Sequence, residues 1–219
     1  MIKRLEIKTN TNSNFIGCWK IDKEVCAKII SFYENNLNDV KPGEAGSRVN
    51  TEVKLSEDIS ILPKDLKEKK YQCMVHYMEK LSECYKDYVA QWPALENMFS
   101  KVECSSFNIQ KYYPGGHFNK FHTERTNIIN SSRVFAWMTY LNKVEDGGNT
   151  DFMHYDLSIK PEEGKTIIWP AEWTHAHKGN VVKKGLKYII TGWFHMPDNL
   201  DYNPQSPSYG TPINRENNK

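Results

Sequence analysis

The chain has 219 residues, of which 39% are hydrophobic and 26% charged, a composition typical of a soluble globular protein. Its formal charge is only +2, which argues against a surface directed at nucleic acid. No stretch has the ~18 apolar residues that a membrane span needs. The N-terminus also lacks the apolar core of a signal peptide. The five cysteines are odd in number and lack C-x-x-C spacing, so we expect reduced thiols and a cytoplasmic location.

Two segments in the first hundred residues have helical periodicity. We expect Asp22 to cap a helix whose apolar residues return at three- and four-residue steps up to Tyr33. Asp65 is expected to cap a longer helix, which Pro93 ends. The apolar stripe of that second helix consists of Tyr71, Met74, Met78, Leu81, Tyr85 and Tyr88. Between the helices, residues 38–63 are polar and contain glycine and proline, which predicts mostly loop with room for a short strand.

After residue 100 the pattern changes to short runs of aromatic and β-branched residues, separated by turns with glycine or proline. These runs are 102–113, 133–142, 165–169 and 186–196. Short strand-like runs separated by such turns favour a β-sandwich or barrel over alternating βαβ units. We therefore expect one domain over 1–197, with a mainly β jelly roll in 101–197 and helices from 1–100 covering one face. Residues 198–219, rich in Pro, Asn and Ser, are expected to form a mobile tail.

Two histidines and a glutamate are the candidate metal ligands. His122 and Glu124 stand two residues apart, and side chains at i and i+2 of an extended segment point to the same side. His175 and His177 are also two apart, and one of them would complete a set of two histidines and one carboxylate. This facial triad holds Fe(II) and leaves coordination positions open. The H-x-E pair alone is common by chance, so surface or backbone-bonded histidines are the alternative.

Three blocks of sequence surround these residues in order. The first is Tyr113-Pro114-Gly115-Gly116, which leads to His122-Thr123-Glu124. The second contains Thr139-Tyr140-Leu141-Asn142 and then Gly147-Gly148-Asn149-Thr150-Asp151-Phe152. The third contains His177-Lys178-Gly179, then Gly185-Leu186-Lys187-Tyr188, then Trp193. Residues 104–194 thereby resemble the 2-oxoglutarate- and Fe(II)-dependent dioxygenases, specifically their prolyl 4-hydroxylase-like branch.

The resemblance implies a double-stranded β-helix, the cupin-like jelly-roll barrel, with helices against it. It also implies that His122, Glu124 and His177 are the catalytic iron ligands. His177 stands ten residues before Lys187, the family's interval from ligand to lysine, whereas His175 stands five after Pro170, which is also a family-like interval. His175 therefore stays open as the alternative ligand.

The resemblance further implies how the cosubstrate is held. Lys187 would pair with the far carboxylate of 2-oxoglutarate, which fits the rule that a buried cation needs a partner. Tyr113 and Tyr140 would place their phenols around the cosubstrate. Glu124 departs from the usual aspartate by one methylene but keeps the charge and the ligand oxygen. Retention of a carboxylate argues against the halogenating relatives.

The implied reaction is hydroxylation of an unactivated C–H bond, coupled to decarboxylation of 2-oxoglutarate to succinate. It would need Fe(II), 2-oxoglutarate and O2, with ascorbate as a candidate reductant. The expected substrate is a prolyl residue of a peptide or protein, and the alternative is a free amino acid or another small molecule. Residues 126–132 and 38–63 are candidate substrate loops. No nucleic-acid or membrane partner is expected, and the expected setting is a bacterial or phage-infected cell.

Two other classes of protein fit part of the pattern. A zinc hydrolase would use the same three ligands with a bound water. It would leave Lys187 and the tyrosines without a role. A non-catalytic jelly-roll binding module would need a broken triad or a missing lysine, and the sequence has neither.

Overall fold

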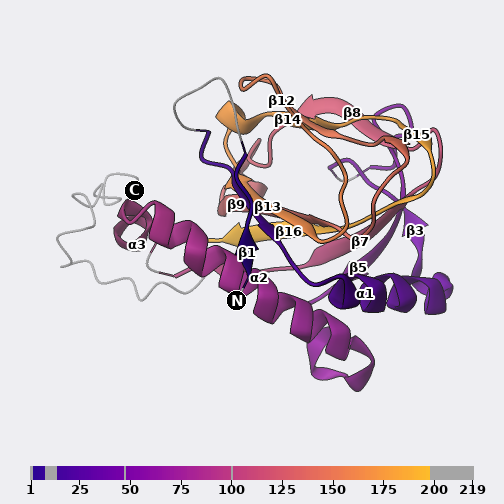
Figure 1. Ribbon diagram of the computed structural model, residues 1–219, viewed down its shortest axis with the longest axis horizontal. Helices are drawn as coiled ribbons and strands as arrows, with labels where there is room; N and C mark the ends of the chain where they lie inside the picture. Colours follow the sequence, from indigo (N-terminus) through magenta and orange to yellow (C-terminus); the bar gives the residue numbers. More distant parts are fainter. Residues whose placement is uncertain (1, 8–13, 47, 100, 198–219) are drawn as a thin grey trace, which may run out of the picture.

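The computed structural model describes residues 2–7, 14–46, 48–99 and 101–197. Two antiparallel sheets face each other, and the helices pack outside the larger one (Figure 1). The larger sheet runs in spatial order β1 (Lys3–Arg4), β2 (Gly17–Lys20), β13 (Lys165–Pro170), β9 (Arg133–Tyr140), β16 (Lys187–His195), β7 (Phe107–Tyr112), β5 (Glu57–Ile61) and β3 (Lys41–Pro42), with β6 (Glu103–Cys104) also paired to β16. This arrangement confirms the predicted jelly-roll class.

The smaller sheet lies across the interior from the larger one. It runs β12 (Leu157–Ile159), β11 (Thr150–Phe152), β14 (His177–Gly179), β8 (His117–His122) and β4 (Lys54–Leu55). A separate two-stranded pair joins β10 (Asp146–Gly147) to β15 (Val182–Lys184). The larger and the smaller sheet contact each other through side chains such as Phe152 and Trp169, whose ring centroids lie 5.6 Å apart.

Side chains along β9 alternate between the two faces of the larger sheet, so this strand contributes to two hydrophobic cores. Phe135 and Trp137 are buried in the core beneath the helices, whereas Met138 and Tyr140 are buried in the core between the sheets. Successive residues of a strand point to opposite faces, so this central strand, apolar on both sides, is covered on both sides. The polar exception is Thr139, whose hydroxyl is 2.9 Å from that of Tyr77 on the covering helix.

The helices are α1 (Lys23–Asn35), α2 (Gln72–Gln91) and the short α3 (Ala94–Met98). The first prediction is confirmed at its start, although Asp22 caps through its backbone carbonyl and its side chain makes no cap bond. The second helix was predicted to start too early: residues after Asp65 form the 3-10 turns η2 (Asp65–Lys67) and η3 (Lys69–Tyr71). The carboxylate of Asp65 accepts the backbone N–H of Leu62 and is therefore engaged before the turn rather than in a helix cap.

The buried stripe of α2 differs from the predicted one. It contains Met74, Tyr77, Leu81, Cys84 and Tyr88. Met78 and Tyr85 of the predicted stripe are only partly buried. The seam that contacts the sheet thus runs one position away from the predicted line, because tertiary contact with the sheet and not periodicity alone selects the buried face.

The first hundred residues also supply strands. The segment read as mostly loop contains η1 (Leu37–Asp39), β3, β4 and β5. β5 pairs with β7, and β4 pairs with β8, so this segment borders both sheets. All five cysteines are free thiols. In the part of the chain that the structure describes, no helix is long and apolar enough to cross a membrane. The predicted tail at 198–219 lies outside the described residues.

Candidate metal centre

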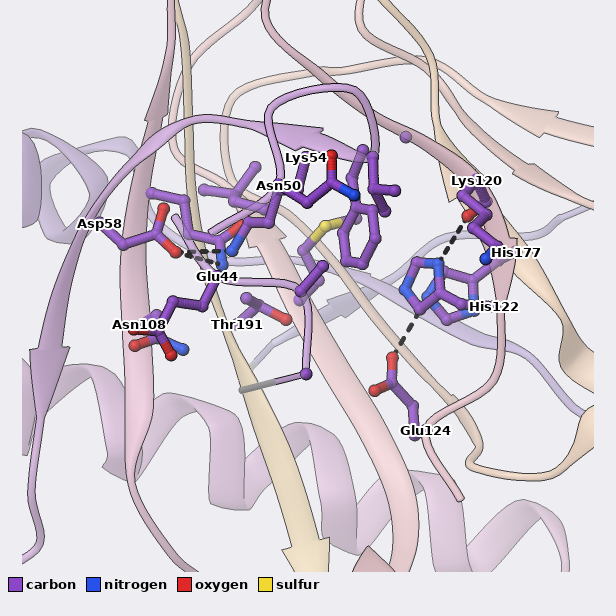
Figure 2. Close-up of a pocket in the computed structure, with 18 of the residues that line it drawn as sticks. Glu44, Asn50, Lys54, Asp58, Asn108, Lys120, His122, Glu124, His177 and Thr191 are labelled. Atoms are coloured by element: carbon purple, nitrogen blue, oxygen red, sulfur yellow. Dashed lines mark hydrogen bonds and ion pairs between the residues drawn. The ribbon is translucent and has the colours of Figure 1, made fainter. Parts of the chain in front are cut away.

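Two paired strands of the smaller sheet, β8 and β14, bring His122, Glu124 and His177 together. His122 ends β8, Glu124 follows it after one residue, and His177 begins β14, directly opposite His122 in the strand register. One possible ligand atom of each residue lies within 4.8 Å of the others. The three side chains point toward one another at one end of a cavity (Figure 2). Among the described residues, these three possible metal ligands lie within reach of one ion, and they combine two histidines with a carboxylate.

The backbone fixes how the two imidazole rings present their nitrogens. Nδ1 of His122 donates to the carbonyl oxygen of Lys120 at 2.9 Å, and Nδ1 of His177 donates to that of His175 at 3.0 Å. Each ring therefore turns its Nε2 toward the centre, the arrangement in which an outer hydrogen bond orients a metal-binding histidine. Phe118 stacks on His122 with ring centroids 3.9 Å apart, which further limits rotation of that ring.

Protonation at the centre also suits a cation. Burial, together with the neighbouring His177, lowers the pKa of His122 to about 4, so this ring is neutral at physiological pH. Burial alone would raise the pKa of Glu124. The hydrogen bond and charge of His177 and the hydrogen bond from the indole N–H of Trp193 outweigh this effect, and the pKa falls to about 2. A neutral imidazole and an ionised carboxylate are the forms that bind a metal. The donor set therefore fits a divalent transition metal.

Two residues hold the carboxylate of Glu124 from behind. The indole N–H of Trp193 donates to Oε2 at 2.7 Å, while Oε1 lies 3.2 Å from Nε2 of His177. The guanidinium of Arg133 stacks 3.6 Å from the centre of the Trp193 ring and donates to the Glu124 backbone carbonyl at 3.2 Å. One carboxylate oxygen is thus occupied by protein, and the other faces the centre.

Replacing Trp193 by phenylalanine tests this support. The variant keeps a ring under Arg133 but leaves Oε2 of Glu124 without its donor, so we expect affinity for Fe(II) or Co(II) to fall about 10- to 100-fold. Anaerobic titration of the metal measures it. Trp173→Phe, at an exposed position, is the matched control and should bind metal like the parent chain. Equal affinities in both variants would show that the indole N–H does not orient the ligand.

His175 lies outside the centre. Its Nε2 is 2.8 Å from the carbonyl oxygen of Asn14 and 3.2 Å from the hydroxyl of Tyr155, and its Nδ1 is 3.0 Å from the hydroxyl of Thr174. Both ring nitrogens are therefore engaged by protein. The sequence left His175 and His177 open as the third ligand, and the geometry favours His177.

This assignment predicts separate consequences for the two histidines. His175→Ala should destabilise the metal-free fold by about 1–3 kcal/mol, because the hydrogen bonds of a buried ring to three partly buried partners are lost. Its metal affinity should stay that of the parent chain. Urea unfolding and metal titration on the same variant measure both quantities. Loss of metal binding without loss of stability would instead make His175 the ligand.

Lys187 is buried on β16 and has no carboxylate partner among the described residues. Its ammonium donates to the carbonyl oxygen of Gly148 at 2.7 Å and lies 5.1 Å and 5.5 Å from the ring centres of Tyr112 and Tyr140. Burial lowers its pKa to about 7. A cation in such a place is unfavourable unless an anion joins it, so this end of the cavity is suited to an anionic ligand.

The predicted tyrosines have different positions. Tyr140 is fully buried beside Lys187, and its hydroxyl lies 2.6 Å from that of Thr150. Tyr113 is 45% exposed, and Tyr112 rather than Tyr113 lines the cavity. The structure thus brings Tyr140 to Lys187 but not Tyr113. The signal that points to Tyr112 is strand phase, since it alternates with Gln110 and Asn108, which also line the cavity.

The cavity that joins these groups has a volume of about 1410 Å³ and lies between the two sheets. Opposite the metal-binding side chains, a polar wall faces the interior (Figure 2). There Nζ of Lys54 is 2.6 Å from Oδ2 of Asp58, and the amide of Gln110 donates to the same oxygen at 3.3 Å. This buried pair was not predicted, because its members lie in a segment that reads as loop.

The family comparison covers the strands that carry this centre. The model of the 2OG-Fe(II) oxygenase superfamily matches residues 107–195, from the start of β7 to the end of β16. Residues 107–195 are thus similar to the 2OG-Fe(II) oxygenase superfamily. The match includes the three candidate ligands and Lys187, so the candidate centre lies inside the 2OG-Fe(II) oxygenase segment.

Sequence relatives of this oxygenase segment are prolyl hydroxylases. Prolyl 4-hydroxylase 13 of Arabidopsis thaliana is 30% identical over 126 residues, which cover 46% of this chain and 46% of that protein. Prolyl 4-hydroxylase subunit alpha-2 of Gallus gallus is 25% identical over 96 residues, which cover 41% of this chain and 18% of that protein. The chain therefore spans less than half the length of these relatives.

Solved structures extend the likeness to most of the fold. A Pseudomonas putida prolyl-4-hydroxylase matches with a TM-score of 0.65 and 13% identity, covering 84% of this chain and 94% of that one. The viral collagen prolyl hydroxylase of Paramecium Bursaria Chlorella virus-1, solved as a 2OG complex, matches with a TM-score of 0.61 and 17% identity, covering 85% and 98%. A Trichoplax adhaerens prolyl hydroxylase, solved with a hypoxia inducible factor peptide fragment, matches with a TM-score of 0.64 and 13% identity, covering 84% and 85%. At these identities the likeness concerns the fold alone, and it confirms the predicted jelly roll.

Proposed function

We propose that the chain is an Fe(II)- and 2-oxoglutarate-dependent dioxygenase that hydroxylates a prolyl residue of a peptide or protein. The observation that carries the proposal is one cavity with a facial set of metal-binding side chains and a buried lysine for which the described residues offer no anionic partner. A metal alone would need only the triad. The lysine adds a place for a dianionic cosubstrate.

His122, Glu124 and His177 would hold the iron, and they bring the single negative charge of Glu124 to it. When bound together, iron, 2-oxoglutarate and O2 supply the oxidising power to hydroxylate an unactivated C–H bond, with release of succinate and CO2. The chain's own residues orient these groups. Outer hydrogen bonds hold both rings, and Trp193 holds Oε2 of Glu124.

Lys187 would bind the far carboxylate of 2-oxoglutarate, beside the ring of Tyr140, whose hydroxyl lies 2.6 Å from that of Thr150. This role separates the proposal from a zinc hydrolase, which has no use for the lysine. Lys187 is only 3% exposed, and its ammonium contacts the rings of Tyr112 and Tyr140 and the carbonyl of Gly148, so little water would compete with the ligand.

A peptide or protein substrate is supported by the size of the cavity. Its volume of about 1410 Å³ exceeds the roughly 300–1,000 Å³ of most small-molecule pockets. The prolyl hydroxylase relatives support the prolyl target. A free amino acid or small molecule is the alternative. We also propose ascorbate as the reductant and a cytoplasmic location, the latter supported by the five free thiols.

The test begins without oxygen. Fe(II) and then 2-oxoglutarate are added to the metal-free protein, and the visible metal-to-ligand charge-transfer band is recorded. A band, followed by succinate release with proline-containing peptides in air, is the expected result; ascorbate should prolong that turnover. A folded, metal-loaded protein that gives no band would contradict the oxygenase assignment and favour a zinc enzyme or a binding module.

A further inference from the structure

Two neighbouring isoleucines stand out from the surface. Ile128 and Ile129 are 90% and 94% exposed, the largest exposures among the large apolar side chains of the described residues. They occupy the 3-10 turn η4 (Ile128–Asn130). Single exposed apolar residues are ordinary, but an adjacent pair at this exposure marks a candidate contact site.

Polar side chains hold the turn in place. The side chain of Asn127 accepts the backbone N–H groups of Ile129 and Asn130, and the side chain of Asn130 accepts those of Thr126 and Asn127. The hydroxyl of Ser131 donates to the carbonyl of Ile128 at 2.7 Å. The exposure of the two isoleucines is therefore a product of a closed hydrogen-bonded turn and not of a frayed loop end.

The turn belongs to the rim of the cavity. It follows Glu124 in the chain, and Thr126 and Asn130, which flank the isoleucines, line the cavity that contains the three candidate ligands. The base of the loop is tied down, because Arg125 pairs with Glu172 and the hydroxyl of Thr123 donates to the carbonyl of Ala171 at 2.8 Å. The isoleucines themselves do not line the cavity but lie outside it, next to its lining.

We infer that Ile128 and Ile129 form a docking patch for an aliphatic side chain of the polypeptide substrate, a few residues along the chain from the modified residue. This inference rests on the proposed function. A small molecule held within the cavity would not reach the pair, whereas a polypeptide with one residue at the metal must leave across the rim. Apolar burial against the pair would select the flanking sequence, while the cavity selects the target residue.

The experiment uses blocked peptides with one proline and randomised flanking residues. Products from the parent chain, sequenced by mass spectrometry, should be enriched in Leu, Ile, Val or Met at a fixed distance from the hydroxylated proline. The double variant Ile128→Ser, Ile129→Ser should lose that enrichment, and KM for the preferred peptide should rise about tenfold or more, as expected for loss of partial burial of two isoleucines. The KM for 2-oxoglutarate and the charge-transfer band should not change. Met98→Ser, on α3 and 67% exposed, is the matched control and should behave like the parent chain.

The outcomes separate this inference from the function on which it rests. Peptides hydroxylated with no flanking preference, or with the same preference and KM in the double variant, would overturn the docking patch alone. A charge-transfer band without hydroxylation of any peptide would remove the peptide substrate and this inference with it. A drop in sedimentation mass in the double variant, without a change in peptide KM, would assign the patch to self-association instead.

Discussion

Replacing His122 by alanine is expected to reduce Fe(II) affinity by more than about 100-fold and to abolish succinate release. The change removes one of the two proposed nitrogen ligands, and removal of a ligand should exceed the roughly 10- to 100-fold effect of removing an outer hydrogen bond. The reason is geometric, since β8 and β14 place His122 opposite His177 and the pair leaves only the carboxylate of Glu124 to complete the set. Metal content after dialysis and the anaerobic charge-transfer band measure the loss.

The control for this variant is His154→Ala. His154 is exposed, and its ring contacts that of Trp173 rather than the metal centre. It should retain metal, band and turnover. Thermal unfolding of both metal-free variants should be cooperative, which would exclude global unfolding as the cause. A His122→Ala protein that binds Fe(II) as tightly as the parent chain would contradict the assignment of this ligand.

The candidate ligands could be chosen from the sequence because their proximity depends on strand geometry that short motifs preserve. His122 ends β8 and Glu124 follows it closely, while the family spacing connects His177 at the start of β14 to Lys187 at the start of β16, with the short β15 between them. The glutamate in place of aspartate is accommodated, since its Oε1 still reaches to 3.2 Å of Nε2 of His177. These local relationships do not require knowledge of the whole fold.

What the sequence did not predict depends on contacts between distant segments. Trp193 and Arg133 support Glu124 from two other strands, and Lys54 and Asp58 pair across a polar segment that reads as loop. Tyr113 carries the family motif, yet the phase of β7 turns Tyr112 inward. A shift of one residue exchanges the two faces of a strand, and periodicity cannot set that phase when both neighbours are tyrosines.

Replacing Lys187 by alanine is expected to weaken 2-oxoglutarate binding by about 2–5 kcal/mol, or roughly 30-fold or more, because a buried anion would lose its partner. Fe(II) binding should remain, since Lys187 is not among the metal-binding side chains. Isothermal titration under anaerobic conditions measures both affinities. Lys187→Arg keeps the charge in a different shape and should recover part of the loss. Unchanged affinity for 2-oxoglutarate in Lys187→Ala would exclude this lysine as the carboxylate partner.

The pH dependence gives this prediction a sharper form. Burial lowers the pKa of Lys187 to about 7 in the free protein, and a bound dianion would raise it. Above about pH 7, binding of 2-oxoglutarate must then take up a proton, and affinity should fall by up to about tenfold per pH unit. Titrations in buffers with different ionisation enthalpies measure the proton uptake. In Lys187→Arg, where the guanidinium stays charged, both the uptake and the slope should disappear.

The free energy of unfolding of the free protein should rise with pH over the range in which the affinity for 2-oxoglutarate falls. Between about pH 7 and the ordinary lysine pKa of 10.5, the unfolded chain binds a proton at Lys187 that the folded chain does not, so the free energy of unfolding rises with pH there. The penalty for burying the charged lysine is fully present below about pH 7. Lys187→Met removes it, so this variant should gain melting temperature over the parent chain at pH 6 and keep less of that gain at pH 9. A gain that is the same at both pH values would contradict the low pKa, whereas the expected pattern would show that burial of this cation costs the free fold stability.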